Sequence, residues 1–318
     1  MNIVILITII FLQILLPVSL ILWLGLRNSA SKIDWAVRFL VVGCFTLWLF
    51  RAGNWAYVSY YARYVLLIFF AAAAIVSFMA LQRSSPFIGH GIWWWTTLSF
   101  KAILIFVFAA LSFLTFRAQG YTDTAISLEY PLREGTYYVA HGGSRTTLNY
   151  HVAVPPQKYA LDIVAINRFG RRSSGLSPTE LERYVIYGHT VYSPCNGEIV
   201  SVVDGLPDLT PPEMNSSQPA GNHIWLRCND VYIIVAHLMN GSIPVKAGDR
   251  VERSQQLGRV GNSGNTSEPH LHIHAVRYDT PPEISTEFLL RNGIAVPMLF
   301  EKHFLIRNDV FRVNKKAH

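Results

Sequence analysis

The residues best suited to chemistry form the segment His270-Leu271-His272, which follows a loop of glycine, asparagine and serine. In a β-strand, alternate side chains fall on one face, so His270, His272 and also His274 would point the same way. A neutral imidazole is the commonest metal ligand and titrates nearest physiological pH. The pair could therefore hold a metal ion and move a proton. The alternative is a polar edge strand with histidines on the surface.

Two more polar residues stand inside apolar segments of the same half of the chain. Asp162 lies among Leu, Ile and Val, where a carboxylate is costly unless it is paired or bound to a metal. His237 ends a strongly apolar run, at a strand end where a catalytic group could face a groove. The structural alternatives are a hydrogen-bonded aspartate and a satisfied core histidine. Further histidines in this half are His141, His151, His189 and His223.

Short strands are the elements that would position these residues. From about Gly135 onward, runs of β-branched and aromatic residues alternate with Gly, Pro, Asn and Asp, which is typical of an antiparallel β domain. A proline-rich segment at 204–221 is predicted to be a long surface loop, and loops of that length often border a site. Apart from a possible short turn at 177–184, this half shows no helical periodicity.

The first third of the chain is apolar instead. Four runs cover about residues 2–26, 35–50, 64–82 and 97–116, and the first can cross roughly 30 Å of hydrocarbon. Because it lacks a basic flank and a small-residue cleavage site, we expect an anchor and not a removable signal peptide. The sequence predicts a membrane domain of about four helices at 1–118, a juxtamembrane linker at 119–134 and a β-rich domain at 135–318.

Charge is distributed unevenly between these halves. Residues 1–116 contain seven lysines and arginines against one acid, whereas the remainder holds 20 basic and 19 acidic residues. The β-rich half is thus nearly neutral and has no basic stripe, so nucleic acid is not an expected partner. The excess of cations at Arg27, Lys32, Arg38 and Arg83 places the first and third loops in the cytoplasm. Both termini, and with them the β-rich domain, are predicted on the outer side of the cytoplasmic membrane.

Three cysteines are present. Cys44 lies in an apolar run and is expected to be a small core residue. Cys195 and Cys228 each lie beside a turn signal. If both turns lie at one end of the same antiparallel sheet, the two could form a disulfide, which would suit an oxidising compartment. Two free thiols are the alternative.

Several segments of the β-rich half occur in an order that is more specific than any one of them. They are 191–200, Ala236-His237-Leu238, 245–251, Gly261-Asn262-Ser263-Gly264 and Pro269-His270-Leu271-His272. Together they resemble the LytM/lysostaphin-type zinc metallopeptidases, over about residues 145–280 and without the membrane half. The resemblance implies a small β-sheet groove that holds one zinc ion, with Asp162 and His272 as ligands and His237 and His270 in catalysis. Such a zinc activates water and polarises the scissile carbonyl.

One position departs from that family's pattern. The early histidine ligand usually stands four residues before the aspartate, where this chain has Lys158, and an ammonium group is a poor ligand. We predict that His151 replaces it. If 148–162 forms a hairpin turning at Pro155-Pro156, His151 lies diagonal to Asp162 on one sheet face. A one-residue change in register would place the two on opposite faces.

The sequence therefore predicts a multi-pass protein of the cytoplasmic membrane that carries a zinc metalloendopeptidase. By resemblance, the enzyme would use Zn²⁺ to hydrolyse the peptide cross-links of bacterial peptidoglycan. The alternative is a catalytically inactive LytM-like module that binds or regulates a partner cell-wall hydrolase. A transport role for the membrane half is disfavoured because its spans hold few ionisable residues.

Overall fold

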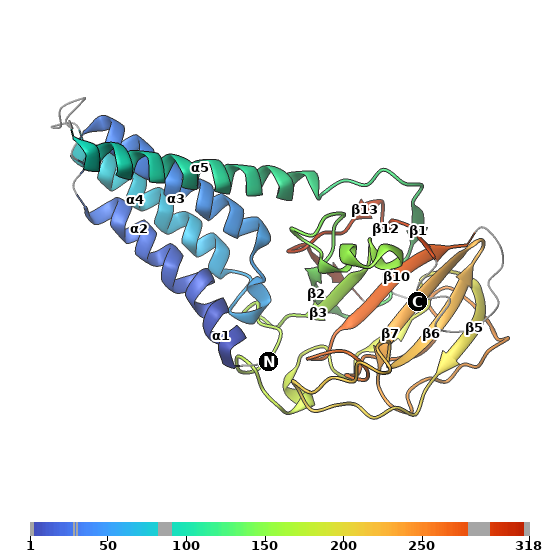
Figure 1. Cartoon of the computed structure of the whole chain (residues 1–318). Coiled ribbons are helices and arrows are strands. Elements are labelled where there is room, and N and C mark those ends of the chain that lie inside the picture. Colours follow the sequence, from blue (N-terminus) through green and yellow to red (C-terminus); the bar gives the residue numbers. More distant parts are fainter. Residues whose placement is uncertain (1–2, 28, 30, 82–90, 279–292, 315–318) are drawn as a thin grey trace. The chain divides into compact units, whose positions relative to one another are not determined.

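The chain folds into two compact units in the computed structural model, one from Ile3 to Arg117 and one from Ala118 onward. The structure describes residues 3–27, 29, 31–81, 91–278 and 293–314 (Figure 1). Arg83, on which part of the predicted membrane orientation depends, lies outside the described residues.

The first unit is helical, as the apolar runs predict. Helices α2, α3, α4 and α5 run alongside one another (Figure 1). Among the described residues, four helices are long and apolar enough to cross a membrane, at Leu6–Leu26, Lys32–Ala52, Ala62–Leu81 and Ile92–Arg117, which confirms the four predicted spans by length and composition. The elements are α1 (Ile3–Ile10), a π-helical turn (Phe11–Leu15), α2 (Leu16–Leu26), α3 (Lys32–Ala52), α4 (Ala62–Leu81) and α5 (Ile92–Arg117).

Large apolar side chains remain exposed along these helices. On α5, for example, Phe100, Ile103 and Phe106 are each at least 60% exposed. Contiguous apolar surface is rare where a protein faces water, so this unit is suited to lipid. Its one acid, Asp34, is paired with Arg38 at 2.6 Å and with Lys101 at 2.8 Å, which offsets the cost of burying charge.

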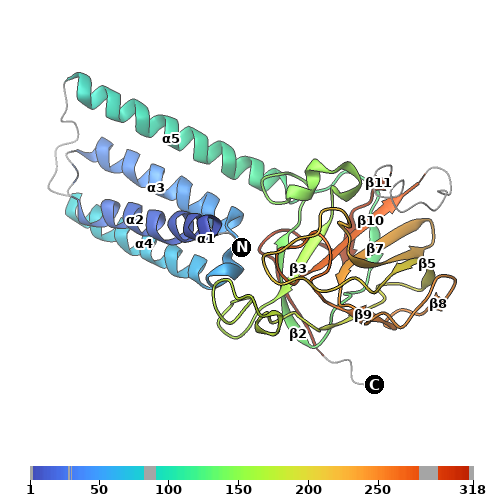
Figure 2. The ribbon, with the colours of Figure 1, turned by 60° about the horizontal axis from the view of Figure 1, so that its bottom comes forward.

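The second unit is built on a nine-stranded sheet. Its strand order is β14-β2-β3-β10-β7-β6-β5-β8, with β11 paired to β10, and all these pairs are antiparallel. Figure 2 shows β3, β10 and β7 as neighbours. The bounds are β2 (Gly135–His141), β3 (Leu161–Ala165), β5 (Gly197–Val203), β6 (Asn222–Cys228), β7 (Val231–Leu238), β8 (Arg250–Val251), β10 (Leu271–Arg277), β11 (Ile294–Ala295) and β14 (Val310–Val313).

Two small sheets complete the unit. One contains β1 (Ile126–Leu128), β12 (Met298–Phe300) and β13 (His303–Phe304), and the other pairs β4 (Thr190–Tyr192) with β9 (Gln256–Arg259). The segment 119–134, expected to be a linker, supplies β1 and places Leu128 and Leu132 in the hydrophobic core. That core lies on the sheet face that carries Val235, Leu271 and Ile273.

Cys195 and Cys228 form a disulfide. Cys195 precedes β5, Cys228 ends β6, and these two strands are paired, so both turns lie at the same end of the sheet. This answers the question that the sequence left open. Cys44 is a free thiol and only half-buried, so it is not the core residue that its apolar surroundings predict.

Candidate metal and catalytic site

The predicted site residues meet on one face of the large sheet, opposite the hydrophobic core. Strand β10 lies between β3 and β7, and its register places His272 opposite Asp162 on one side and Ala236 on the other. Residues directly opposite in a sheet have side chains on the same face. Because Leu271 and Ile273 point into the core, His272 and Asp162 point away from it together.

Asp162 is the centre of this group. Its Oδ1 lies 2.9 Å from His272 Nδ1, and both of its carboxylate oxygens lie 3.0 Å from His151 Nε2. Tyr150 donates its hydroxyl to Oδ2 at 3.1 Å. Burial alone would raise the pKa of Asp162, but the neighbouring His151 and His270 hold that pKa well below its usual value. Asp162 is therefore a carboxylate, the form that can bind a metal.

His151 reaches Asp162, but not by the predicted hairpin. Residues Tyr150–Ala153 and Pro155–Gln157 form two 3-10 turns, because the prolines fix the backbone and remove two donors that strand pairing would need. Buried Asn149 closes this segment: its Oδ1 accepts from His151 N, and its Nδ2 donates to the carbonyls of Gly143 and Ala160 at 3.0 Å each. The hairpin prediction is wrong, although the two side chains meet as expected.

Lys158 takes no part in this group. Its ammonium lies 3.2 Å from the carboxylate of Asp123, and its side chain is 38% exposed. The hydroxyl of Tyr159 donates to the same carboxylate. The residue at the position of the missing ligand thus pairs elsewhere, and His151 occupies a place next to Asp162 instead.

The donor set suits a zinc ion. One potential ligand atom from each of His151, Asp162 and His272 lies within 4.8 Å of the other two, and all three residues are buried. Gln157 Oε1, which can only accept, lies 3.1 Å from His151 Nδ1, so Nδ1 carries a proton and Nε2, 3.0 Å from the Asp162 carboxylate, is the nitrogen available to a metal. With a cation between them, this nitrogen and the Asp162 carboxylate would both act as ligands, which offsets the cost of burying them together. Two nitrogens and a carboxylate are also ligands that zinc prefers.

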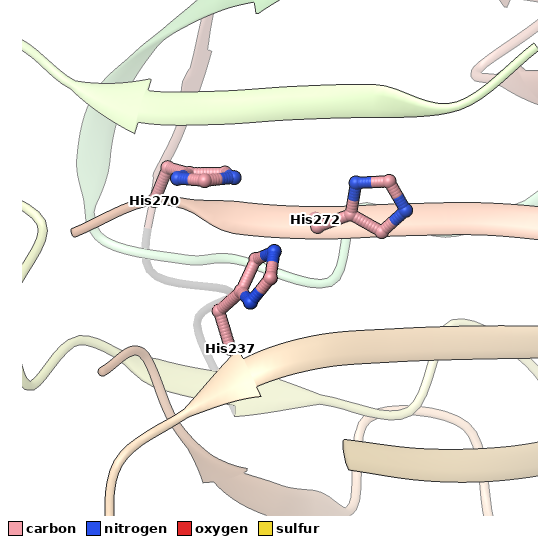
Figure 3. A group of neighbouring side chains, drawn as sticks. All are labelled: His237, His270 and His272. Carbon is pink, nitrogen blue, oxygen red and sulfur yellow. The ribbon is translucent and has the colours of Figure 1, made fainter. Parts of the chain in front are cut away.

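His237 and His270 stand beside this group. Figure 3 shows His237 projecting from the end of β7 toward His270 and His272, with ring centroids 4.9 and 5.7 Å away. His237 Nδ1 donates to Ser263 O at 2.9 Å, and His270 Nδ1 donates to Glu268 O at 2.9 Å. In both rings, Nε2 therefore remains available to accept or donate a proton. The buried Nε2 of His270 has no hydrogen-bond partner among the described residues and lies 3.5 Å from Asp162 Oδ1.

The two imidazoles have different proton affinities. Burial, with the charges of His270 and His272, holds the pKa of His237 well below its usual value. Burial would also lower the pKa of His270, but the carboxylate of Asp162 raises it overall. Groups whose pKa values are pushed apart in one site are suited to the separate roles of base and acid. A cation bound at Asp162 would offset part of the effect on His270.

Three histidines of the site lie within a segment that matches a known family. Residues 184–283 match peptidase family M23. His237, His270 and His272 fall inside the M23 segment, whereas His151 and Asp162 precede it. The match to this family confirms the resemblance that the motifs predict.

Known relatives share parts of the chain. Over 89 residues it is 32% identical to the peptidoglycan DD-endopeptidase ShyA of Vibrio cholerae, a segment that is 26% of this chain and 20% of ShyA. The chain thus matches about a fifth of that relative's length. A zinc-containing peptidase from Vibrio cholerae is 19% identical, with 54% of this chain and 39% of that chain covered and a TM-score of 0.29. Lysostaphin from Staphylococcus simulans is 25% identical, with 34% and 42% covered and a TM-score of 0.21.

The long loop at 204–221 is bound to the Gly-Asn-Ser-Gly motif of the M23 segment. Asp208 accepts from Asn262 N at 2.6 Å and from Asn240 N at 3.1 Å, and Asn265 N donates to Pro219 O at 3.0 Å. At its end, Ala220 O accepts from His237 N at 3.1 Å. The loop is therefore a fixed neighbour of His237.

Sequence reasoning missed the support under His270. The carboxylate of Glu268 is held by Arg172 through two bonds of 2.6 and 2.7 Å, and Arg172 is only 2% exposed. This buried pair fixes the segment whose carbonyl orients His270. Nothing in the polar surroundings of Arg172 signals burial. The hydrogen bonds of Asn149 were also not predicted, although an asparagine two residues before His151 is a recognisable turn signal.

Four more histidines of this half have hydrogen-bond partners of their own. His274 Nδ1 lies 2.9 Å from His272 Nε2. His189 Nδ1 lies 3.1 Å from the hydroxyl of Tyr137, and His223 Nδ1 donates to Gly221 O at 2.7 Å. His141 Nδ1 accepts from Arg307 at 2.7 Å.

Proposed function

We propose that this protein is a membrane-anchored zinc metalloendopeptidase that hydrolyses the peptide cross-links of bacterial peptidoglycan. The observation that carries the proposal is the buried group His151, Asp162 and His272 with His237 and His270 beside it. The M23 match at 184–283 supports a peptidase, and ShyA, the similar V. cholerae protein, is a peptidoglycan DD-endopeptidase.

His151, Asp162 and His272 would hold the metal. When bound, Zn²⁺ supplies a Lewis acid that lowers the pKa of water and polarises a carbonyl. His151 would offer Nε2, Asp162 a carboxylate oxygen and His272 Nδ1, the atoms that face one another in the structure. Three protein ligands leave a position open for water, as in other catalytic zinc sites.

His237 and His270 would handle the protons. His237, kept neutral by its lowered pKa, accepts a proton at Nε2 from the attacking water and later returns it to the departing amine. His270, whose Nε2 has no hydrogen-bond partner among the described residues, would donate a hydrogen bond from Nε2 to the oxygen on which negative charge develops. The carbonyls of Ser263 and Glu268 hold the two rings in these orientations.

One observation supports a location outside the cytoplasm, and another supports attachment to the membrane. Disulfides persist in oxidising compartments, and Cys195–Cys228 is formed. The four apolar helices could hold the β unit at the membrane, within reach of the cell wall.

The test is hydrolysis of isolated peptidoglycan by the full chain in detergent. We expect release of soluble muropeptides with new amino termini, and loss of that release after chelation and its return with zinc. The variant His270→Ala is the control without the proposed catalytic histidine. If zinc-loaded wild type releases no more muropeptides than His270→Ala, the protein is instead a non-catalytic module of the kind that regulates another hydrolase.

A further inference from the structure

Each histidine of the metal group uses its second ring nitrogen for a hydrogen bond within the β unit. His151 Nδ1 lies 3.1 Å from Gln157 Oε1, and His272 Nε2 lies 2.9 Å from His274 Nδ1. We propose that Gln157 and His274 are positioning residues, each holding one histidine in the tautomer whose lone pair faces the metal. This inference rests on the proposed zinc site.

Gln157 is itself held rigidly. Its N–H donates to Val154 O at 2.8 Å, and its carbonyl accepts from Ala160 N at 2.8 Å, so the residue is fixed at the end of the 3-10 turn. An amide oxygen only accepts, which requires the N–H of His151 on Nδ1. The ring can then rotate little, and Nε2 stays 3.0 Å from both carboxylate oxygens of Asp162.

His274 performs the same task for His272 from within β10. It is 2% exposed and lies two residues along the strand, on the same face as His272. His272 Nδ1 is directed at Asp162, so a metal-binding His272 carries its proton on Nε2, where His274 Nδ1 accepts it. Outer partners of this kind fix the ring and raise the basicity of the ligand.

A consequence follows from the chemistry of the two partners. Both are neutral acceptors, and a negatively charged acceptor would strengthen the basicity of the ring it contacts. At position 274, a leucine variant should therefore bind the metal most weakly and a glutamate variant most tightly. Glutamine should lie between them, near the affinity of the native histidine. At position 157 leucine should bind more weakly than glutamine, and glutamate at least as tightly.

The experiment measures the affinity of the full chain in detergent for Zn²⁺ and Co²⁺ by competition with a chelator. The variants are Gln157→Leu, Gln157→Glu, His274→Leu, His274→Gln and His274→Glu. The matched control is His189→Gln, a half-buried histidine of the β unit that contacts the Tyr137 hydroxyl and not the metal group. We expect a 10- to 100-fold loss for each leucine variant, with a changed Co²⁺ absorption spectrum, and wild-type affinity for the control and for His274→Gln.

The outcomes separate this inference from the proposed function. Wild-type protein that binds no zinc removes both. Tight binding by wild type and equally tight binding by both leucine variants overturns the positioning role and leaves the zinc site standing. Equal weakening in the leucine, conservative and control variants shows a general packing role and also overturns it. If a leucine variant does not fold, the zinc affinities of His274→Gln, Gln157→Glu and the control decide the question. Wild-type affinity in His274→Gln and the control, with at least wild-type affinity in Gln157→Glu, supports the positioning role, and weaker binding by Gln157→Glu than by the control overturns it.

Discussion

At the scale of single residues, His237 has an unusual backbone. Its φ is +62°, in the left-handed region that residues other than glycine rarely adopt. Bonds from His237 N to Ala220 O and from Gly261 N to His237 O hold it there. Such a conformation costs about 1–3 kcal/mol and is concentrated at functional sites. Here it directs the ring toward His270 at the strand end.

This backbone gives the first prediction, which concerns His237→Asn. Asparagine tolerates the left-handed region better than most residues, so the melting temperature should stay near that of wild type. Peptidoglycan hydrolysis should fall by about 10²–10⁴-fold because the proton acceptor is lost. Muropeptide release and thermal unfolding measure the two effects. Activity above a tenth of wild type would remove His237 from proton transfer.

At the scale of elements, the segment 149–160 decides whether the site exists. It is two 3-10 turns closed by Asn149, whose amide group satisfies two buried carbonyls. The second prediction is that Asn149→Ala lowers the unfolding free energy of the β unit by about 1–3 kcal/mol, since it leaves buried groups unsatisfied. Zinc affinity should fall as His151 moves. Chemical denaturation and chelator competition would detect both changes.

A matched variant separates the two jobs of this side chain. Asn149→Asp keeps the oxygen that accepts from His151 N but loses the bonds donated to the carbonyls of Gly143, Lys158 and Ala160. It should therefore lose stability like the alanine variant. An aspartate variant as stable as wild type would show that the donated bonds do not close the turn.

The same elements show how far sequence reasoning reaches. Strand parity places His270 and His272 on one face, because it follows directly from residue order. The family resemblance adds Asp162 and His237, and the ring of His237 reaches the site through its left-handed backbone instead of through parity. Whether His151 joined them depended on the path of 148–162, and Pro155-Pro156 permitted either a hairpin or 3-10 turns. Side-chain bonds from Asn149 and Gln157 within this segment stabilise the 3-10 turns, and hydrophobic periodicity gives no information on such side-chain bonds.

At the scale of the whole molecule, the oxidation state of the cysteines reports the compartment in which the β unit lies. The third prediction uses the cysteines: denatured, unreduced protein taken from its native membrane should react with a maleimide at one thiol, Cys44, and at three thiols after reduction. Mass spectrometry counts the labels. Three labels before reduction would indicate a reducing compartment and would contradict an outer location.

Membrane orientation provides the fourth prediction. A protease added outside spheroplasts should degrade the β unit while the membrane remains intact, because the predicted topology places both termini outside. Cleavage should occur first in exposed segments such as the one around Met214. Full protection, with cleavage only after lysis, would remove peptidoglycan as a substrate.

The most direct test of the central claim is the zinc content of the purified full chain and three variants. A catalytic site formed by His151, Asp162 and His272 predicts about one zinc per chain in wild type. His151→Ala and Asp162→Ala should lose the metal, whereas Lys158→Ala should keep it because Lys158 pairs with Asp123. Zinc absent from wild type, or retained in His151→Ala and lost in Lys158→Ala, would contradict the account.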